Sequence, residues 1–152
     1  MFSGPRLALA LTAIAAVASI SNAVRAQDDD PGQAAFTKIC VKCHTPERIV
    51  SERRTRAQWQ EVIDTMVVKG AEGTDEDFDA VMQYLLRHHG RVDVNKAPAG
   101  DMTLVLAIRP GDAEAIVSYR RSKGPFADFD ALSQVPGIDV DRLAHERDAL
   151  SF

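Results

Sequence analysis

A chain of 152 residues, of which 45% are hydrophobic and 26% are charged, has the size and composition of one ordinary globular domain or two very small ones. Its formal net charge of -4 gives it no general electrostatic attraction to nucleic acid or to an anionic membrane surface.

The first 26 residues have the pattern of an export signal. Arg6 precedes an apolar stretch from Leu7 to Ile20, and Val24 and Ala26 are the small residues that a signal peptidase recognises. An uncleaved membrane anchor is the alternative, but this stretch is shorter than the roughly 20 residues of a spanning helix. We expect cleavage after Ala26, a periplasmic location and no stable membrane insertion afterwards. The mature chain is then more acidic, with 16 lysines and arginines against 22 aspartates and glutamates.

Both cysteines of the chain lie in one short motif, Cys40-Val41-Lys42-Cys43-His44. Cys-x-x-Cys-His is the attachment signature of c-type haem. Two thiols separated by two residues can join the two vinyl groups on one porphyrin edge, while the adjacent imidazole reaches the iron. The motif predicts a single covalent haem c held by Cys40 and Cys43, with His44 as an axial ligand.

Other uses of a cysteine pair fit less well. A disulfide is possible in an exported protein. A thioredoxin-type redox pair would follow a βαβ pattern, and no run of β-branched residues precedes Cys40. A zinc site would need two further ligands, but His88, His89 and His145 do not stand at zinc-finger spacing.

Helical periodicity surrounds the motif. A short helix from Gly32 to Phe36 leads into it, and Phe36 lies one turn before Cys40, where it either faces the cofactor or belongs to the core. Thr45-Pro46 then interrupts the helix. The apolar period returns twice, at Trp59, Val62, Ile63, Met66 and Val67, and at Phe78, Val81, Met82, Leu85 and Leu86.

The candidates for the second axial ligand are Met66, Met82, His88 and His89. Several features between about Gln33 and Gly90 resemble the small class I cytochromes c, in particular mono-haem subunits that accept electrons from periplasmic dehydrogenases. The matching residues are Arg53, Arg54, Arg56, Trp59, Met66, Gly70-Ala71, Thr74-Asp75-Glu76 and Tyr84-Leu85. The resemblance assigns the ligand to Met66, with His88 or His89 as alternatives and Met82 as a core residue. Met66 also lies on an apolar stripe, so ordinary packing is its other possible role.

The arginine-rich turn has two possible roles. One or two of Arg53, Arg54 and Arg56 could bind the haem propionates through charge-assisted hydrogen bonds. They could equally belong to a solvated turn. Their spacing selects no single residue.

A second small unit follows Gly90, which is placed to end a helix, and the extended piece Val92-Asn95. The segment from about Val92 to Phe152 resembles the helix-hairpin-helix domain of the periplasmic DNA receptor ComEA. The matching residues are Val94-Asn95-Lys96-Ala97, Ala113-Glu114-Ala115-Ile116-Val117-Ser118-Tyr119-Arg120, Gly124-Pro125-Phe126 and Val135-Pro136-Gly137-Ile138.

The hairpins of this unit lack glycines that the hairpins of DNA-binding relatives contain. Those relatives use glycine-rich hairpins whose backbone N–H groups approach a phosphate. The first hairpin, Val105 to Arg109, has no glycine, and the second keeps Gly137 but places Asp139 where the other glycine belongs. A carboxylate there would repel a phosphate. Arg120, Arg121 and Lys123 could touch a phosphate or form a wet helix face. We therefore expect no nucleic-acid partner and interpret the unit as a protein-docking module or a structural extension.

The sequence predicts an all-α protein with a signal peptide at residues 1–26, a cytochrome c domain at 27–90 and a helix-hairpin-helix domain at 91–152. We expect an electron carrier that passes single electrons from a periplasmic dehydrogenase to a further acceptor. No catalytic constellation is visible, so we expect no enzymatic turnover. One alternative is a periplasmic DNA-binding protein with a structural or sensory haem. Another is a haem protein with an open sixth position that binds small ligands.

Overall fold

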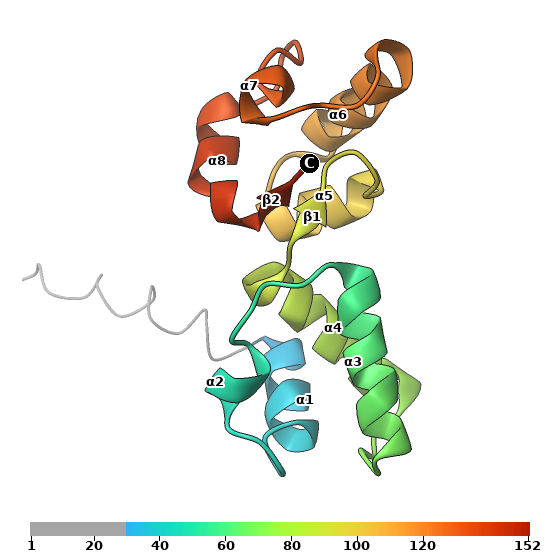
Figure 1. Ribbon diagram of the computed structural model, residues 1–152. Coiled ribbons are helices and arrows are strands. Elements are labelled where there is room, and N and C mark those ends of the chain that lie inside the picture. The colour runs from blue at the N-terminus through green and yellow to red at the C-terminus, as the bar shows by residue number, and fades with distance from the viewer. Residues whose placement is uncertain (1–29) are drawn as a thin grey trace, which may run out of the picture.

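The computed structural model describes residues 30–152, and the predicted export signal, residues 1–26, lies outside them. Within the described residues the chain forms eight α-helices and one small sheet (Figure 1), which confirms the predicted all-α fold class. None of the helices in this part of the chain is long and apolar enough to cross a bilayer.

The first group of helices surrounds the Cys-x-x-Cys-His motif. It comprises α1 (Pro31–Ile39), α2 (Pro46–Ile49), α3 (Arg56–Val68) and α4 (Asp75–His89). These helices begin where the sequence provides caps. The Asp30 carboxylate accepts the N–H of Gly32 at 2.8 Å, while Thr55 and Thr74 each open a capping box. Helix α1 ends at the first cysteine, so the motif lies in the turn between α1 and α2.

Close packing of α1 on α4 fixes where the motif begins. A Cβ at Gly32 would lie 2.4 Å from the carbonyl oxygen of Ala80 and 2.7 Å from Cβ of Tyr84, so only glycine allows this approach. The Phe36 ring lies 5.1 Å from the Tyr84 ring and is 3% exposed. Phe36 is therefore a core residue, the second of the two roles predicted for it.

The apolar stripe predicted on α3 divides between two environments. Trp59 and Ile63 are buried in the core, while Val62 and Met66 are half-buried. Val67 continues the predicted helix, and its side chain is 46% exposed in the last turn of α3. The half-buried Val62 and Met66 can thus contact something other than the core.

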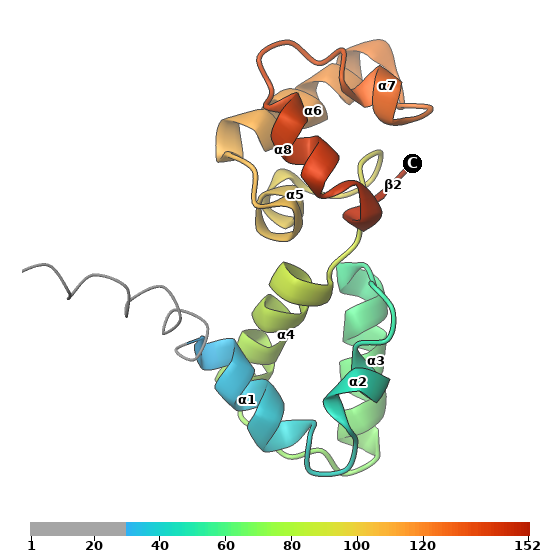
Figure 2. The same cartoon turned by 90° about the vertical axis from the view of Figure 1, so that its left-hand side faces the viewer.

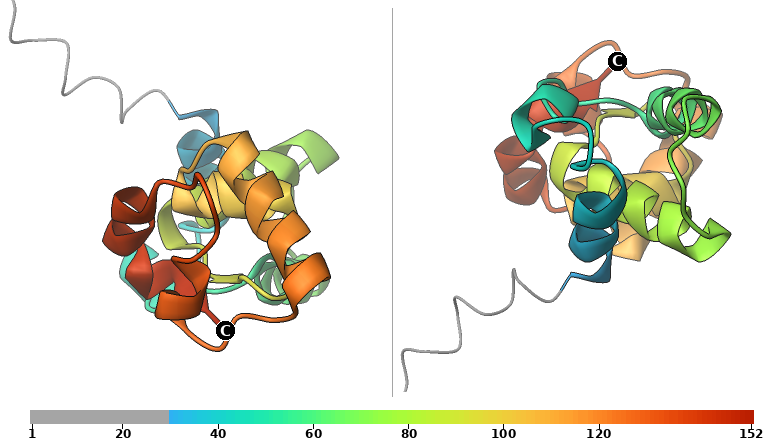
Figure 3. Two further views of the ribbon diagram at one scale, coloured as in Figure 1. Left: turned by 90° about the horizontal axis from the view of Figure 1, so that it is seen from above. Right: turned by 90° about the horizontal axis from the view of Figure 1, so that it is seen from below.

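The second group of elements follows β1 (Val92–Asp93). It comprises α5 (Ala99–Leu106), α6 (Pro110–Lys123), α7 (Phe129–Leu132), α8 (Val140–His145), a 3-10 turn at Arg147–Ala149 and β2 (Leu150–Ser151). Strand β1 pairs in parallel with β2, with Val92 opposite Leu150, so the end of the unit closes on its beginning. Seen from above (Figure 3), α5 lies between α6 and α8.

Two polar side chains hold the start of this unit on its body. Asn95 makes a pair of hydrogen bonds with the backbone of Phe126, donating to its oxygen at 2.9 Å and accepting from its N–H at 2.7 Å. Arg120 donates to the carbonyl oxygens of Val94, Lys96 and Ala97. The Arg120 guanidinium is thus used inside the unit rather than on a solvent-facing helix surface.

The two groups share one apolar core. Helix α4 packs on α1 in the first group and on α5 in the second, and the buried apolar residues form one continuous cluster from Ala35 to Leu150. Figure 2 shows the end of α4 directly below α5 at the junction. The domain boundaries predicted from the sequence remain predictions.

Candidate functional site

The motif opens into a cavity between the turn after α1 and the inner side of α3. Its volume is about 350 Å³, within the usual range for cofactor sites. Cys40, Cys43 and His44 line it from the turn, and Met66 lines it from α3. Helices α1 and α3 stand on opposite sides of the first group (Figure 2), so the motif and Met66 approach the cavity from different elements.

The rest of the lining has two kinds of side chain. Most are apolar, and the charged ones are mainly cations in a chain that is acidic overall. The apolar residues include Ile39, Ile49, Val62, Ile63, Phe78, Val81 and Leu85, and the charged residues are Lys42, Arg48, Arg54, Lys69 and Glu72. Apolar walls suit a porphyrin face, and cations suit its two propionates.

The two cysteines are not joined to each other. Both are free thiols, Cys40 half-buried and Cys43 exposed. Burial raises the pKa of the Cys40 thiol. Among residues 30–152 no three histidine, cysteine or acidic side chains gather as a metal site. Two thiols, an imidazole and a thioether around one cavity are donors of the kinds that fit a haem.

The alternative ligands, His88 and His89, lie elsewhere. Neither lines the cavity. His88 Nε2 lies 3.5 Å from an oxygen of Asp30, and its ring is 4.8 Å from the Tyr84 ring. The His89 carbonyl accepts the indole N–H of Trp59 at 3.2 Å. Burial, together with the charges of His88 and Arg53, lowers the pKa of the His89 imidazole.

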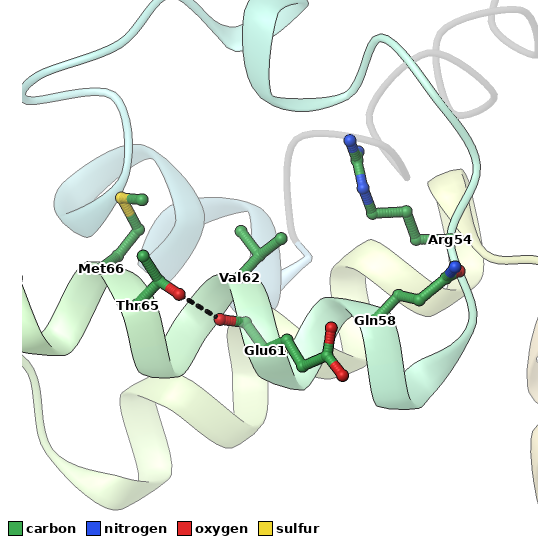
Figure 4. A pocket seen from close by; sticks show the side chains of 6 residues that line it. All are labelled: Arg54, Gln58, Glu61, Val62, Thr65 and Met66. Atoms are coloured by element: carbon green, nitrogen blue, oxygen red, sulfur yellow. Dashed lines mark hydrogen bonds between the residues drawn. The ribbon is translucent and has the colours of Figure 1, made fainter.

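Met66 shares its surroundings with an adjoining surface pocket. Figure 4 shows Met66, Val62 and Arg54 extending to the same side of α3, with the ribbon of the α2 segment passing above them. Gln58, Glu61 and Thr65 complete the lining of this pocket. The exposed side of the Met66 position is therefore partly polar, while its inner side faces the apolar cavity.

The three arginines of the arginine-rich turn make different contacts. Only Arg54 lines the cavity. Its guanidinium carbon lies 5.0 Å from the centre of the Trp59 ring, a cation–π distance. Arg53 donates to the carbonyl oxygen of Gly90 at 3.1 Å, and Arg56 binds Asp101 at 2.8 Å. Arg54 is thus the propionate candidate of the three, and the other two are engaged at the junction with the second group.

Sequence reasoning missed several cavity residues. Arg48, Ile49 and Lys69 come from α2 and from just past the C-terminal end of α3, and no spacing rule connects them with the motif. Lys42 lies inside the motif itself and could have been included on that ground. Only the folded arrangement brings the others together.

The two hairpins of the second group carry carboxylates at their helix starts. Between α5 and α6, Ala107 adopts a left-handed backbone with φ of 47°, and Arg109 binds the buried carboxylate of Asp112 at 2.7 and 3.0 Å. Between α7 and α8, Gly137 has φ of 79°, and Asp139 caps α8 by accepting the N–H of Arg142 at 2.9 Å. Each helix start thus already has an anionic group of its own.

Comparison with known families agrees with the predicted fusion. Residues 5–72 match the family model for the haem-binding domain of the quinohemoprotein amine dehydrogenase alpha subunit. Residues 87–151 match the model for the helix-hairpin-helix motif. Comparisons with curated proteins and with solved structures gave no match. The two matches follow one another along the chain in the order of the predicted fusion.

Proposed function

We propose that the chain is a periplasmic mono-haem c-type cytochrome that carries single electrons from a periplasmic dehydrogenase to a further acceptor. The observation that carries the proposal is that Cys40, Cys43, His44 and Met66 line one cavity. The match of residues 5–72 to a dehydrogenase haem-binding domain supports the choice of partner class.

Each residue of the cavity has a distinct role in this proposal. The Cys40 and Cys43 thiols would hold the cofactor covalently through thioethers, whose formation from a thiol and a vinyl group needs no oxidant. The His44 imidazole and the Met66 thioether would bind the iron. Bound haem supplies a one-electron iron couple, and thioether ligation favours a raised reduction potential. Two ligands from the protein would leave the iron no open position, which would favour electron transfer over binding of small ligands.

The second group is assigned a protein-docking or structural role rather than DNA binding. Asp112 and Asp139 place negative charge at the helix starts that DNA-binding relatives offer to phosphate. Arg120 is engaged with backbone carbonyls inside the unit. These contacts weigh against the alternative of a DNA-binding protein with a structural or sensory haem.

The test is the mass of the exported protein made in cells with a haem-maturation system. The proposal expects a polypeptide that begins after Ala26 and carries one haem, resistant to acid-acetone extraction. Cys40→Ser and Cys43→Ser should each remove one thioether, and His44→Ala should abolish the normal low-spin spectrum. His145→Ala is the matched control, because His145 lies on α8 away from the cavity. A bare polypeptide mass for the unaltered chain would refute the proposal.

A further inference from the structure

The segment Arg53 to Arg56, here called the junction segment, is hydrogen-bonded to the end of α4. The Arg54 N–H donates to the carbonyl oxygen of His89 at 3.1 Å, and the Arg91 N–H donates to the carbonyl oxygen of Arg54 at 2.8 Å. These bonds form a single parallel bridge between Arg54 and Gly90. The backbone on both sides of the Arg54 side chain is thereby held where the two helical groups meet.

Two neighbouring arginines extend this attachment into the second group. Arg53 donates to the carbonyl oxygen of Gly90 at 3.1 Å, and Arg56 Nε donates to Asp101 Oδ1 at 2.8 Å. Asp101 lies on α5, and its side chain is only 13% exposed. A charge-assisted bond to a mostly buried carboxylate is stronger than an ordinary surface ion pair.

The junction also supports the Arg54 side chain directly. Trp59 is fully buried, and its indole N–H is bound to the His89 carbonyl at 3.2 Å. The Arg54 guanidinium lies over this fixed ring, donates to the carbonyl oxygens of Ile49 and Glu52, both at 3.4 Å, and forms an ion pair with the exposed carboxylate of Glu52 at 3.3 Å. These long bonds use little of the donor capacity of a guanidinium, which has five N–H groups. Arg54 is thus held at the cavity wall with donors to spare.

We propose that the helix-hairpin-helix unit is a working part of the haem site, because Asp101 and Arg56 position the junction segment and so keep the Arg54 charge beside the cofactor. This inference rests on the proposed function. A fixed cation next to the cavity disfavours the more positive ferric state and raises the reduction potential. Asp101 and Arg56 are positioning residues in this account, and Arg54 is the residue that acts on the haem.

The deciding measurement is the midpoint potential of the Asp101→Asn holoprotein. If Asp101 acted on the haem only through its own negative charge, removing that charge would raise the potential. If Asp101 positions Arg54, its replacement lowers the potential, and this decrease is the expected result. Asp130→Asn is the matched control, because Asp130 is exposed on α7 and forms no ion pair among the described residues. It should leave the potential unchanged or raise it slightly.

Two further variants keep the test independent of charge and of folding. Arg56→Lys keeps the net charge but loses the planar guanidinium, so it should also lower the potential. Arg54→Gln should lower it most, and adding Asp101→Asn to Arg54→Gln should cause no further decrease. An increase in Asp101→Asn, or a further decrease in the double variant, overturns the inference. If the unaltered chain carries no haem, the proposed function itself has failed, which is a separate outcome.

Discussion

At the scale of single residues, the candidate haem ligands come together in the site for different reasons. Cys40, Cys43 and His44 are adjacent in the chain, so their proximity is a consequence of the motif. Met66 reaches the same cavity only because α3 stands on the opposite side of the first group from α1. His88 and His89, which spacing leaves as candidates, lie outside the cavity.

Replacing Met66 tests the assignment of the second axial ligand. Met66→Ala should abolish the weak far-red ferric absorption band that marks iron bound to methionine sulfur. It should also lower the midpoint potential, within the roughly 0.8 V range that axial ligands span. Carbon monoxide should then bind the ferrous form, because one axial position is open.

His88→Ala is the matched control for this experiment. It should keep the far-red band and exclude carbon monoxide, because His88 lies against Asp30 and Tyr84 instead of the cavity. Retention of the band in Met66→Ala together with its loss in His88→Ala would reverse the assignment.

At the scale of secondary structure, the crossing of α1 and α4 determines where the motif turn lies. The crossing is close because Gly32 has no side chain to separate the two helices. Caps and apolar periodicity predicted where α3 and α4 occur. They did not predict that Val62 and Met66 on α3 face a cavity while Trp59 faces the core, because periodicity identifies an apolar face but not what covers it.

A methyl group at Gly32 should therefore disturb the crossing. Gly32→Ala should reduce the free energy of unfolding by about 1–3 kcal/mol, since the added Cβ meets the Ala80 carbonyl. Gly100→Ala is the control, because nothing lies within 4 Å of the corresponding Cβ. It should be neutral or stabilising by about 0.4–1 kcal/mol. Urea titration of both variants measures the difference, and equal stabilities would show that the crossing tolerates a side chain.

At the scale of the whole molecule, the two helical groups are joined by shared packing as well as by the chain. Helix α4 contacts both α1 and α5, and the buried residues form one cluster. The junction segment adds hydrogen bonds and an ion pair between the groups. We expect the two groups to unfold as a unit, because each buries apolar surface against the other.

Cooperative unfolding can be followed at two places. Trp59, the single tryptophan of the chain, reports on the first group, and circular dichroism reports on all helices. Both signals should change in one coincident urea transition. Leu143→Ala on α8, where Leu143 is 1% exposed, should destabilise the protein by about 2–5 kcal/mol and shift both signals equally. A tryptophan transition that stays in place while the helical signal splits would mean that the groups are independent.

The amino-acid sequence by itself predicts the all-α class, the haem motif and the helix-hairpin-helix unit, because each depends on residues close together in the chain. Tertiary packing alone decides that Met66 rather than His88 or His89 reaches the cavity. It also decides that Arg54 lines the cavity while Arg53 and Arg56 hold the junction. Three arginines within four positions look alike in a sequence. Their roles differ because each points to a different distant segment, and distances between such segments exist only once the chain has folded.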